Sequence, residues 1–545
     1  MLSVAAELAG TAAAEAAGRR ITLERPPRAS FGDYSTNAAL LLAPAAKSSP
    51  RELAERLGEA LAVRLGHELE RFEVAGPGFL NLYLSDAWHL RALDAALSAG
   101  VGFGGGGAHT PERIIVEFVS ANPTGPMHVG HARNAAYGDA LARLLAFHGH
   151  SVWREFYVND AGSQIVKLGE SIAALARGEQ VATDGYRGEY VTGLVAKLAD
   201  ASRMEPAELG RAAVAIIVGQ IAGSLSVFRV SFDSWSYESA LHRAREDLRD
   251  EDGRPVSAVE HALAMLERAG HTYRSEGALW LRSTDFGDDK DRVLVRSSGE
   301  HTYFASDIAY HQDKRERGFD RQINVWGADH HGYMARMRAA YEALGGDPDH
   351  LDMLIMQLVH LVHRGERSQM SKRSGEFVTL DDLLDEIGVD AARWFLLSRS
   401  HDTTIDLDLD LAREQSSENP VYYVQYAHAR IASMLAKAGS ERVQRALEEV
   451  GRSDEQLHPA ERALVKKLLG FQGEVEEAAT RRAPHRIAAY ALELAQEFTA
   501  FYRDCRVVGA ETVPLESLRI ALSVASQRTI ARSLDLLGVS APSEM

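Results

Sequence analysis

Hydrophobic positions in the first 84 residues alternate between two spacings. Alanine-rich stretches follow a helical period, whereas 71–84 has strand-like apolar positions on either side of a bend at Gly76-Pro77-Gly78. We therefore expect a small module of helices and one strand pair. The next stretch, 100–113, contains four consecutive glycines, so we expect an unpacked linker there and a domain boundary close to residue 105.

The middle of the chain repeats one arrangement of strand, tight loop and helix. A β-branched run at 114–119 is followed by a loop with proline and glycine at 121–126 and by a helix-compatible stretch at 128–147. A second strand at 323–326 leads into a similar loop at 327–331. Strands that alternate with helices predict a parallel, Rossmann-like sheet, in which ligands bind beyond the carboxyl ends of the strands.

Helical spacing dominates from about residue 411 onwards. Apolar residues recur there every three or four positions, as one face of a single helix requires, at Ile487, Ala491, Leu494, Phe498, Phe501 and Cys505. The patterns together predict an α/β protein with a small α+β domain at 1–105, a Rossmann-like domain at 106–410 and an all-α helix bundle at 411–545. We expect a mostly helical insertion at about 162–281 within the second domain.

Composition narrows the class of protein. The 545 residues are 46% hydrophobic and 25% charged, which is typical of a soluble globular protein. The 77 acidic and 60 basic residues give a net charge of −17, which argues against a protein that coats nucleic acid without specificity. A single cysteine, Cys505, excludes an intramolecular disulfide and favours a reducing compartment. The chain shows neither a secretory signal pattern nor a long enough apolar run, so we expect a cytoplasmic protein without a membrane partner.

The sequence His128-Val129-Gly130-His131 stands where the first loop meets the following helix. The N-terminus of a helix collects unsatisfied N–H groups and a partial positive charge, which suit a phosphate. The two imidazoles can donate to phosphate oxygens, and Gly130 leaves room for a purine to lie flat on the backbone. An HxGH pattern alone occurs often by chance, so two ordinary histidines at a helix start are the alternative.

A polar loop at 369–375, with the sequence QMSKRSG, follows the apolar run 354–362. Its basic side chains, Lys372 among them, can neutralise the charge that spreads over a triphosphate when the bond to its α-phosphorus changes. Taken alone, the loop would be an exposed basic segment.

Together and in this order, the two motifs resemble the H-I-G-H and K-M-S-K-S elements of class I aminoacyl-tRNA synthetases. Their surroundings are similar to arginyl-tRNA synthetases in particular, almost from end to end. The segments that carry this resemblance are GDYSTNAAL (32–40), AGPGFLN (75–81), VEFVSANPTGPMHVGHARNA (116–135), FYVNDAGSQI (156–165), YRGEYV (186–191), TYFASDIAYH (302–311), WGADHHGY (326–333) and NPVYYVQYAHAR (419–430). The resemblance implies a tRNA-contacting N-terminal domain, a class I catalytic domain and a helical anticodon-binding domain.

The activity that the resemblance implies is the ATP-dependent ligation of L-arginine to its cognate tRNA through an arginyl-adenylate. It makes His128, His131 and Lys372 catalytic, and it places ATP against the set His128, Gly130, His131, Met370, Ser371 and Lys372. Gln369 and Arg373 depart from the family pattern, since they replace the first lysine and the last serine of K-M-S-K-S. Some arginyl enzymes without the second lysine carry one just ahead of H-I-G-H. Gly125 occupies that place here, so we expect the catalytic charge to rest on Lys372.

An arginine pocket needs carboxylates, because a guanidinium is planar, permanently charged and has five donors. Glu117 falls at the end of the first strand, and Tyr303 and Asp307 are four residues apart, hence on one face if their stretch is helical. By resemblance these three residues bind the arginine side chain, and Asn122 holds its α-amino and carboxylate end. The alternative for Glu117 and Asp307 is a structural ion pair.

The stretch Asp329-His330-His331 has two interpretations. By resemblance, Asp329 or His330 also contacts the α-amino and carboxylate end of arginine. Adjacent histidines beside an aspartate could suggest a metal site, but neighbouring residues diverge around a helix and no third ligand has suitable spacing. We therefore expect no structural metal, and Mg²⁺ only as the companion of ATP, which needs no all-protein cage.

Candidate tRNA contacts lie towards both ends of the chain. The C-terminal helices are rich in arginine, at Arg481, Arg482, Arg486, Arg503, Arg506, Arg519, Arg528 and Arg532. Beside nearby tyrosines, such a set suits phosphate contact and base stacking on an unpaired loop. From these features and the resemblance, we expect contacts with tRNA(Arg) from Asn81, Tyr422, Tyr426, Arg430 and Arg486.

Two alternatives stay open. Another class I synthetase would share both motifs, although the lack of cysteine ligands for zinc disfavours the cysteine enzyme, and an acidic amino acid would want basic residues where Glu117 and Asp307 stand. The other alternative is a catalytically silent tRNA-binding paralogue, against which the intact His128, His131 and Lys372 argue. We expect the protein to be a monomer.

Overall fold

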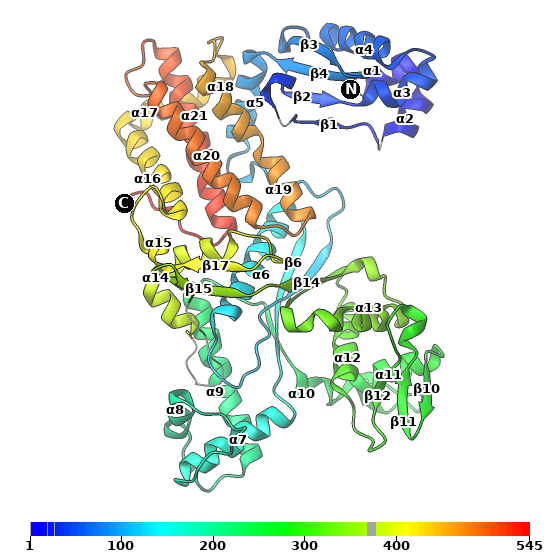
Figure 1. The fold of residues 1–545 in the computed structure, drawn as a ribbon. Helices are drawn as coiled ribbons and strands as arrows, with labels where there is room; N and C mark the ends of the chain where they lie inside the picture. The colour runs from blue at the N-terminus through cyan, green and yellow to red at the C-terminus, as the bar shows by residue number, and fades with distance from the viewer. Residues whose placement is uncertain (1, 19, 27, 368–377) are drawn as a thin grey trace.

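A computed structural model describes residues 2–18, 20–26, 28–367 and 378–545, and Figure 1 shows its fold. A five-stranded sheet of strand order β14-β13-β5-β6-β7 lies at the centre, and all neighbouring strands in it are parallel. Its strands are β5 (Arg113–Glu117), β6 (Ser151–Val158), β7 (Ser234–Tyr237), β13 (Arg321–Gly327) and β14 (Leu351–Met356). This sheet confirms the Rossmann-like prediction.

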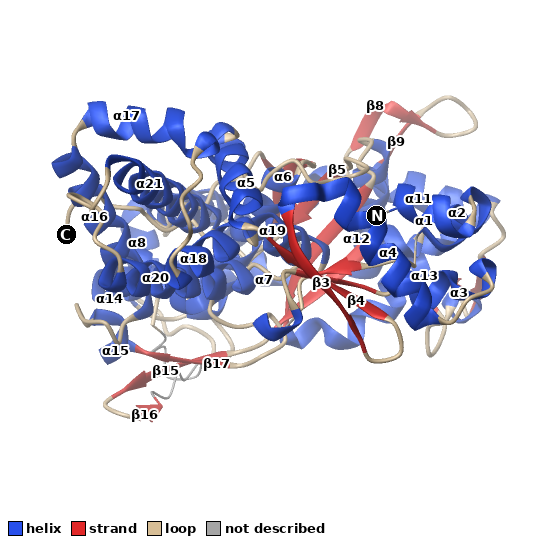
Figure 2. Cartoon of the chain, turned by 90° about the horizontal axis from the view of Figure 1, so that it is seen from above, coloured by secondary structure: helices blue, strands red, loops and turns tan. Residues whose placement is uncertain are grey.

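Two separate hydrophobic cores cover the two faces of this sheet. Figure 2 shows the molecule from above, with its strands in red and its helices in blue. α6 (Val129–His148) packs on one face, and its core continues into the C-terminal helices. α11 (Ala258–Arg268), α12 (Tyr303–Glu316) and α13 (Met334–Ala343) belong to the core on the other side. A parallel sheet needs this double cover, because its strands are apolar on both faces.

The strand register aligns polar residues of three neighbouring strands at the carboxyl edge of the sheet. Glu117 of β5 pairs with Asn324 of β13 on one side and with Glu155 of β6 on the other. α12 crosses this row, with Tyr310 bonded to Glu155 and Lys314 bonded to Glu117. Both helix and strands therefore point charged groups at one edge.

The segment at 162–281, predicted as a mostly helical insertion, is helical in its first half and mixes short strands with helices in its second half. The first half contains α7 (Ser163–Ala176), α8 (Glu189–Lys197) and α9 (Pro206–Val227). In the second half, β7 completes the central sheet, and it is followed by α10 (Glu238–Leu241), β8 (Ala244–Arg249), β9 (Pro255–Ser257), α11, β10 (Thr272–Ser275), β11 (Ala278–Leu281) and, just beyond the segment, β12 (Arg292–Val295). The prediction is wrong here because such short strands show too little apolar alternation to stand out in the sequence.

α9 is long and apolar enough to cross a membrane by length and composition alone. In the structure it packs along α7, and its apolar residues Leu209, Ile217, Ile221 and Leu225 are buried. Packing within the protein accounts for this apolar stripe.

Residues 2–84 form a separate small module, drawn in blue in Figure 1. Its four strands have the order β1-β2-β4-β3. The elements are α1 (Leu2–Ala9), α2 (Thr11–Gly18), β1 (Leu23–Glu24), β2 (Tyr34–Thr36), α3 (Ala38–Ala46), α4 (Pro50–Leu65), β3 (Leu69–Ala75) and β4 (Phe79–Leu84). β3 and β4 are antiparallel, which confirms the predicted strand pair.

Polar contacts attach this module to the C-terminal helices. Arg25 donates to the carbonyl oxygens of Lys466 and Leu469, at 2.8 and 2.9 Å, near the end of α18 (Pro459–Leu469). The last carbonyl groups of a helix lack partners within it, so a guanidinium is a suitable cap. Lys466 adds an ion pair with Asp33 of the module at 2.6 Å.

The glycine-rich stretch 100–113 is packed, which corrects the prediction of an unpacked linker. A Cβ atom at Gly104 would lie 2.4 Å from Cδ1 of Phe471, and one at Gly105 would lie 2.8 Å from the carbonyl oxygen of Phe147. Only glycine allows the backbone to approach these residues so closely. Glycine-rich composition usually indicates a flexible segment, but here the lack of side chains allows the backbone to pack closely against neighbouring residues.

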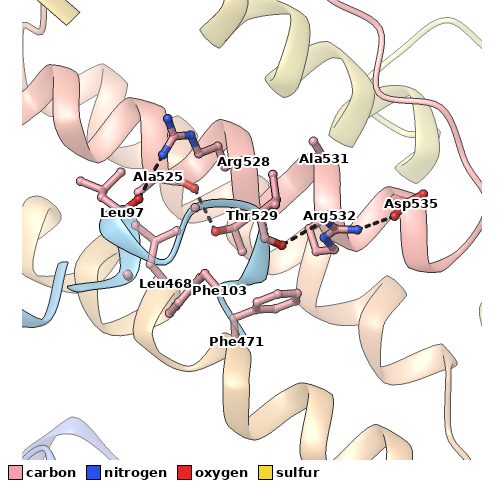
Figure 3. A pocket seen from close by; sticks show the side chains of 13 residues that line it. Leu97, Phe103, Leu468, Phe471, Ala525, Arg528, Thr529, Ala531, Arg532 and Asp535 are labelled. Carbon is pink, nitrogen blue, oxygen red and sulfur yellow. Dashed lines mark hydrogen bonds and ion pairs between the residues drawn. The ribbon is translucent and has the colours of Figure 1, made fainter. Parts of the chain in front are cut away.

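A cavity of about 310 Å³ adjoins this stretch, between α5 (Asp86–Ser98) and α21 (Val513–Leu536). Figure 3 shows Leu97, Phe103 and Phe471 lining it, with Arg528 donating to the carbonyl oxygen of Leu97 at 3.2 Å. Arg528 and Arg532, two of the arginines named above as candidate phosphate contacts, line this cavity, but no described residue of the predicted catalytic, ATP or arginine sites does. It belongs to the junction between α5 and the C-terminal helices.

Helices make up most of the last third of the chain. The remaining elements are β15 (Val359–His363), β16 (Glu366–Arg367), α14 (Leu380–Leu397), β17 (Ile405–Asp408), α15 (Leu409–Arg413), α16 (Pro420–Ala438), α17 (Ser440–Glu449), α19 (Phe471–Thr480) and α20 (His485–Asp504). The predicted apolar stripe lies on α20 and is buried along its length, with Cys505 directly after the helix and also buried. This confirms the prediction of a C-terminal helix bundle.

Candidate active site

The HVGH motif lies beyond the carboxyl end of β5 and contacts the segment that follows the second motif. The backbone N–H of Val129 donates to the carbonyl oxygen of Val378 at 3.3 Å, and that of Leu380 donates to Met127 at 2.9 Å. His128 and Thr379 thereby face each other in a short antiparallel bridge. The segment that directly follows the QMSKRSG loop is thus bound to the HVGH motif. Met370, Ser371 and Lys372 themselves lie outside the described residues.

His128 and His131 form a stacked pair at the start of α6. Their ring centroids are 3.7 Å apart, and the ring planes differ by 22°. Nδ1 of His128 accepts from the backbone N–H of Gly130, and Nδ1 of His131 accepts from that of His128. A neutral imidazole whose Nδ1 accepts carries its proton on Nε2. Both rings therefore hold donor nitrogens at a helix N-terminus, as a phosphate site requires.

Gly130 has a structural role that the sequence analysis missed. A Cβ atom there would lie 2.9 and 3.0 Å from Cε1 and Nδ1 of His128. Any larger residue would push the His128 ring out of its stacked position. The exposed backbone of Gly130 also remains compatible with the predicted purine contact.

The loop after β5 contains two strained residues in succession. Val119 has a φ of +67° and Ser120 a φ of +40°, a region that side chains with a Cβ atom rarely adopt. The buried side chain of Asn134 stabilises the turn, since its Oδ1 accepts from Val119 N at 2.7 Å and its Nδ2 donates to the carbonyl oxygen of Val325 at 2.9 Å. The strain lies directly between Glu117 and Asn122, two predicted site residues.

Glu117 has protein partners on both carboxylate oxygens. Oε2 accepts from the ammonium group of Lys314 at 2.7 Å, and Oε1 accepts from the hydroxyl of Ser120 at 2.9 Å. The side chains of Glu117 and Lys314 are 7% and 0% exposed. The alternative of a structural ion pair is therefore realised for Glu117, although its oxygens retain further lone pairs for a ligand.

Asp307 lies on α12, which confirms that its stretch is helical. It accepts a hydrogen bond from the hydroxyl of Tyr333. Removal from water, together with the charges of Glu117 and Glu238, raises the pKa of Asp307 to about 7, against the opposing effects of the Tyr333 hydrogen bond and the charge of Lys314. A carboxylate with this pKa has a strong preference for a cationic partner.

Glu238 is a candidate that the sequence analysis missed. It follows β7 directly and is 4% exposed. With the side-chain amide of Asn159 oriented so that its NH2 group and its oxygen both have suitable partners, Glu238 accepts a hydrogen bond from that NH2 group at 2.8 Å. Burial and the neighbouring Asp160 raise the pKa of Glu238. Only recognition of Ser234–Tyr237 as a strand of the main sheet would have pointed to it.

The remaining predicted arginine contacts also follow parallel strands or face them. Asn122 is exposed in the loop after β5, and Asp329 and His330 are exposed in the turn after β13. Tyr303 is 54% exposed at the start of α12, with its hydroxyl so close to Gly162 that a Cβ there would lie 2.6 Å away. The structure therefore brings these residues to one edge of the sheet, and none of them is buried.

Three predicted tRNA contacts gather in the C-terminal helices. Tyr422 and Tyr426 of α16 are stacked, with centroids 6.2 Å apart and an interplanar angle of 11°. Arg430, one turn further on, lies over the ring of Tyr502 at 4.4 Å. Tyr426, Arg430 and Tyr502 line a largely polar cavity of about 940 Å³ between α16 and α20.

Two predicted tRNA contacts are not available in this structure. Asn81 is 3% exposed within β4, so RNA cannot reach its side chain. Arg486 forms an ion pair with Glu474 at 2.9 Å and stands at the opposite end of α20 from the cavity. Much of the predicted basic character is also neutralised, because Arg482, Arg519 and Arg532 pair with acidic side chains. Sequence shows the arginines but not these long-range partners.

Comparisons with known proteins match most of the chain to domains of one family. Residues 2–84 match the arginyl tRNA synthetase N terminal domain, 93–184 and 252–433 match the catalytic domain of class I (R) tRNA synthetases, and 424–545 match the DALR anticodon binding domain. An arginine–tRNA ligase of Anoxybacillus flavithermus is 44% identical over 98% of this chain and 96% of its own length. One of Bacillus subtilis is 43% identical over 96% of this chain and 94% of its own.

The chain belongs to the arginyl-tRNA synthetase family. Solved structures agree: a putative arginyl-tRNA synthetase of Campylobacter jejuni has a TM-score of 0.76 at 34% identity, and covers 85% of this chain and all of its own. The Thermus thermophilus arginyl-tRNA synthetase has a TM-score of 0.75 at 26% identity, over 97% and 98% of the two chains. Membership in the arginyl-tRNA synthetase family confirms the class I fold and the predicted enzyme class, an arginine–tRNA ligase that uses ATP.

Proposed function

We propose that the described edge of the sheet is where this enzyme joins L-arginine to AMP and then to tRNA(Arg). The observation that carries the proposal is the backbone pairing of Met127–Val129 with Val378–Leu380, beside the carboxylates of Glu117, Asp307 and Glu238. The groups suited to phosphate lie at the start of α6, and those suited to a cation lie at the end of β5, in α12 and at the start of α10. The reaction needs both, because it joins a nucleotide to a cationic amino acid.

In the first step, a carboxylate oxygen of arginine attacks the α-phosphorus of ATP and pyrophosphate leaves. The Nε2–H groups of His128 and His131 and the N-terminus of α6 are suited to hold the phosphates. Lys372, and with it Met370 and Ser371, remain the predicted clamp from the other motif. Positioning and charge stabilisation suffice, so no covalent enzyme intermediate is needed.

Magnesium is part of this proposal only as the ion that accompanies ATP. Among the described residues, no group of three or more His, Cys, Asp or Glu side chains is arranged to hold a metal ion. An ion that is bound mainly by the triphosphate itself needs no such group of protein ligands. Its charge would add to the hydrogen bonds of the two imidazole donors in offsetting the phosphates.

The arginine side chain is proposed to enter between α12 and the ends of β5 and β7. Asp307 supplies the principal carboxylate, and Glu117 and Glu238 add negative charge on either side. Tyr303 covers the pocket from the start of α12. Asn122, with Asp329 or His330, is proposed to hold the α-amino and carboxylate end of arginine. Asn122 is an exposed polar residue that precedes the HVGH motif by a few positions, and Asp329 and His330 are exposed polar residues that follow the adjacent strand, β13.

Transfer to tRNA follows when the terminal adenosine hydroxyl attacks the activated carbonyl carbon and AMP leaves. We propose that the cavity beside Tyr422, Tyr426 and Arg430 receives unpaired bases of the anticodon loop, because stacked tyrosines and a guanidinium recognise splayed RNA bases. We further propose a cytoplasmic enzyme that acts as a monomer. Equilibrium sedimentation with and without tRNA tests the last point.

The decisive experiment is aminoacylation of total tRNA with each of the twenty amino acids in turn. Arginine alone should be attached. Lys372→Ala should lower kcat by orders of magnitude with little change in arginine or tRNA binding, because the lysine acts mainly on charge that develops in the transition state. Charging of a different amino acid would reject the arginine pocket, and tRNA binding without any charging would favour the silent paralogue.

A further inference from the structure

Lys314 is a buried cation that no step of the proposed reaction uses. Its side chain is 0% exposed, although it lies only two turns along α12 from Asp307. Its Nζ donates to Glu117 Oε2 at 2.7 Å and to Asn324 Oδ1 at 3.0 Å, and it lies 4.1 Å from the ring centroid of Tyr310. All three contacts are internal, so the charge is held in one place.

A continuous chain of hydrogen bonds joins Lys314 back to the backbone of Asp307. Asn324 Nδ2 donates to Nε2 of His311 at 2.8 Å, and Nδ1 of His311 donates to the carbonyl oxygen of Asp307 at 2.8 Å. Burial lowers the pKa of His311 to about 3, so the ring is neutral and has the single proton that this arrangement needs. The network thus links the helical turn of Asp307 to the strand end of Glu117.

Carboxylates act directly on Asp307, whereas the guanidinium groups of Arg336 and Arg292 act on its hydrogen-bond partner Tyr333. Glu117 faces Asp307 from β5 and Glu238 from the end of β7, while Tyr333 from the turn after β13 and Tyr157 from β6 contribute only hydroxyl groups. Lys314 is the cation that lowers the proton affinity of Asp307. Three carboxylates this close would otherwise tend to keep a proton among themselves, and a protonated carboxyl cannot form an ion pair with a guanidinium.

We propose that Lys314 is a positioning residue for arginine: it fixes the Glu117 carboxylate between the ammonium and Ser120, and its charge favours the ionised form of Asp307 for the incoming guanidinium. The inference rests on the proposed function of this edge of the sheet. It assigns Lys314 an effect on substrate recognition beyond the stability of a buried ion pair.

Tyr310 offers a matched control for a purely structural role. It lies one turn before Lys314 on α12, is equally buried, and its hydroxyl donates to Glu155 at 2.7 Å, so it also ties α12 to a strand end. Tyr310→Phe removes that hydrogen bond and keeps the ring beneath Lys314. Lys314→Met removes the charge at similar volume, and Lys314→Arg keeps the charge but changes the hydrogen-bond geometry.

The test measures KM for arginine, KM for ATP and kcat/KM for arginine between pH 6 and 9, with thermal unfolding of each variant. For Lys314→Met we expect the arginine KM to rise about tenfold or more, the ATP KM to stay within about twofold, and the acid limb of kcat/KM to move to higher pH. Lys314→Arg should raise the arginine KM by a few-fold, yet leave the acid limb in place. Tyr310→Phe should lower the unfolding temperature without moving that limb.

Each outcome decides the inference. If Lys314→Met gives the same arginine KM and acid limb as Tyr310→Phe, the lysine is a structural residue only and the inference fails. If Lys314→Met does not fold, the folded Lys314→Arg variant decides. A shift of its acid limb rejects the charge effect, and an unchanged KM for arginine in this variant rejects the positioning effect. If the parent protein does not charge tRNA with arginine, the proposed function fails first, independently of any variant.

Discussion

Buried carboxylates at the carboxyl edge of the central sheet fall into two contrasting groups. Within β6, Glu155 receives two hydrogen bonds from Arg317, at 2.7 and 2.8 Å, and further ones from Tyr310 and Ser234. Burial would raise the pKa of Glu155, but the Arg317 hydrogen bonds and the charges of Lys314 and Arg317 lower it to about 2. This carboxylate is saturated by partners from within the protein.

One strand away, Asp307 and Glu238 have the opposite behaviour. Burial raises the pKa of Asp307 to about 7, and it raises that of Glu238 as well. Their partners among the described residues are a hydroxyl and an amide, neither of which carries charge. The sheet thus carries both a finished structural ion pair, at Glu155, and two carboxylates, Asp307 and Glu238, whose raised pKa values suit a cationic ligand.

The largest expected effect is on the structural side of this comparison. Glu155→Gln should lower the free energy of unfolding by about 3 kcal/mol, because Arg317 and Tyr310 lose a buried anionic partner. Urea unfolding followed by circular dichroism measures the change. The folded fraction should still prefer arginine over other amino acids, and a lost preference would place Glu155 in the pocket instead.

An effect of comparable size is expected for Asp307, but on catalytic activity and not on stability. Asp307→Asn should lower kcat/KM for arginine by the equivalent of about 2–5 kcal/mol, because the guanidinium loses a charge-assisted partner. ATP binding should change little. The measurement compares the charging of arginine, which is cationic, with the binding of citrulline, its neutral analogue. If the variant discriminates between the two as well as the parent does, the assignment of Asp307 is contradicted.

The same variant should not lose stability, which sharpens the contrast with Glu155. The folded-state pKa of Asp307 is raised above its usual value of 3.8, so ionisation disfavours the folded state as pH rises from about 4 to 7. Asparagine avoids this cost. We expect Asp307→Asn to unfold at an equal or higher temperature than the parent at pH 8, as differential scanning calorimetry can show.

A smaller effect is expected for Glu238. Glu238→Gln keeps the size of the side chain and its acceptor for Asn159, but it removes one negative charge from the pocket. The arginine KM should rise about tenfold, while kcat stays within a few-fold, because the lost interaction is present in ground and transition states alike. Steady-state aminoacylation kinetics would separate the two constants; a change in kcat alone would indicate a role in transition-state stabilisation instead.

The smallest expected effect is the number of protons released when arginine binds. A bound guanidinium stabilises ionised Asp307, so arginine binding should release about 0.5 to 1 proton per site near pH 6.5 and fewer above pH 8. The affinity for arginine should accordingly rise with pH up to about 7. Isothermal titration calorimetry in two buffers of different ionisation enthalpy gives the number, and proton uptake would have the wrong sign for this pocket.

Local patterns in the sequence determined much of the protein. The β-branched run before the HVGH motif predicted β5 and α6, the four-residue spacing of Tyr303 and Asp307 predicted a shared helix face, and the apolar stripe predicted α20. Such features depend on residues close together in the chain, whose backbone geometry and burial follow from spacing alone. The motifs, read together, also led to the family that the comparisons show.

Only the tertiary structure decided which charged groups meet. Lys314 pairs with Glu117 across 197 positions of sequence, Glu238 joins the pocket through a strand too short to recognise, and Arg486 faces Glu474 instead of solvent. Likewise, the glycines near Gly104 proved to be packing contacts and Asn81 a buried residue. A spacing pattern reports which face of an element is apolar, but the electrostatic partner of a buried charge depends on segments that come together only when the chain folds.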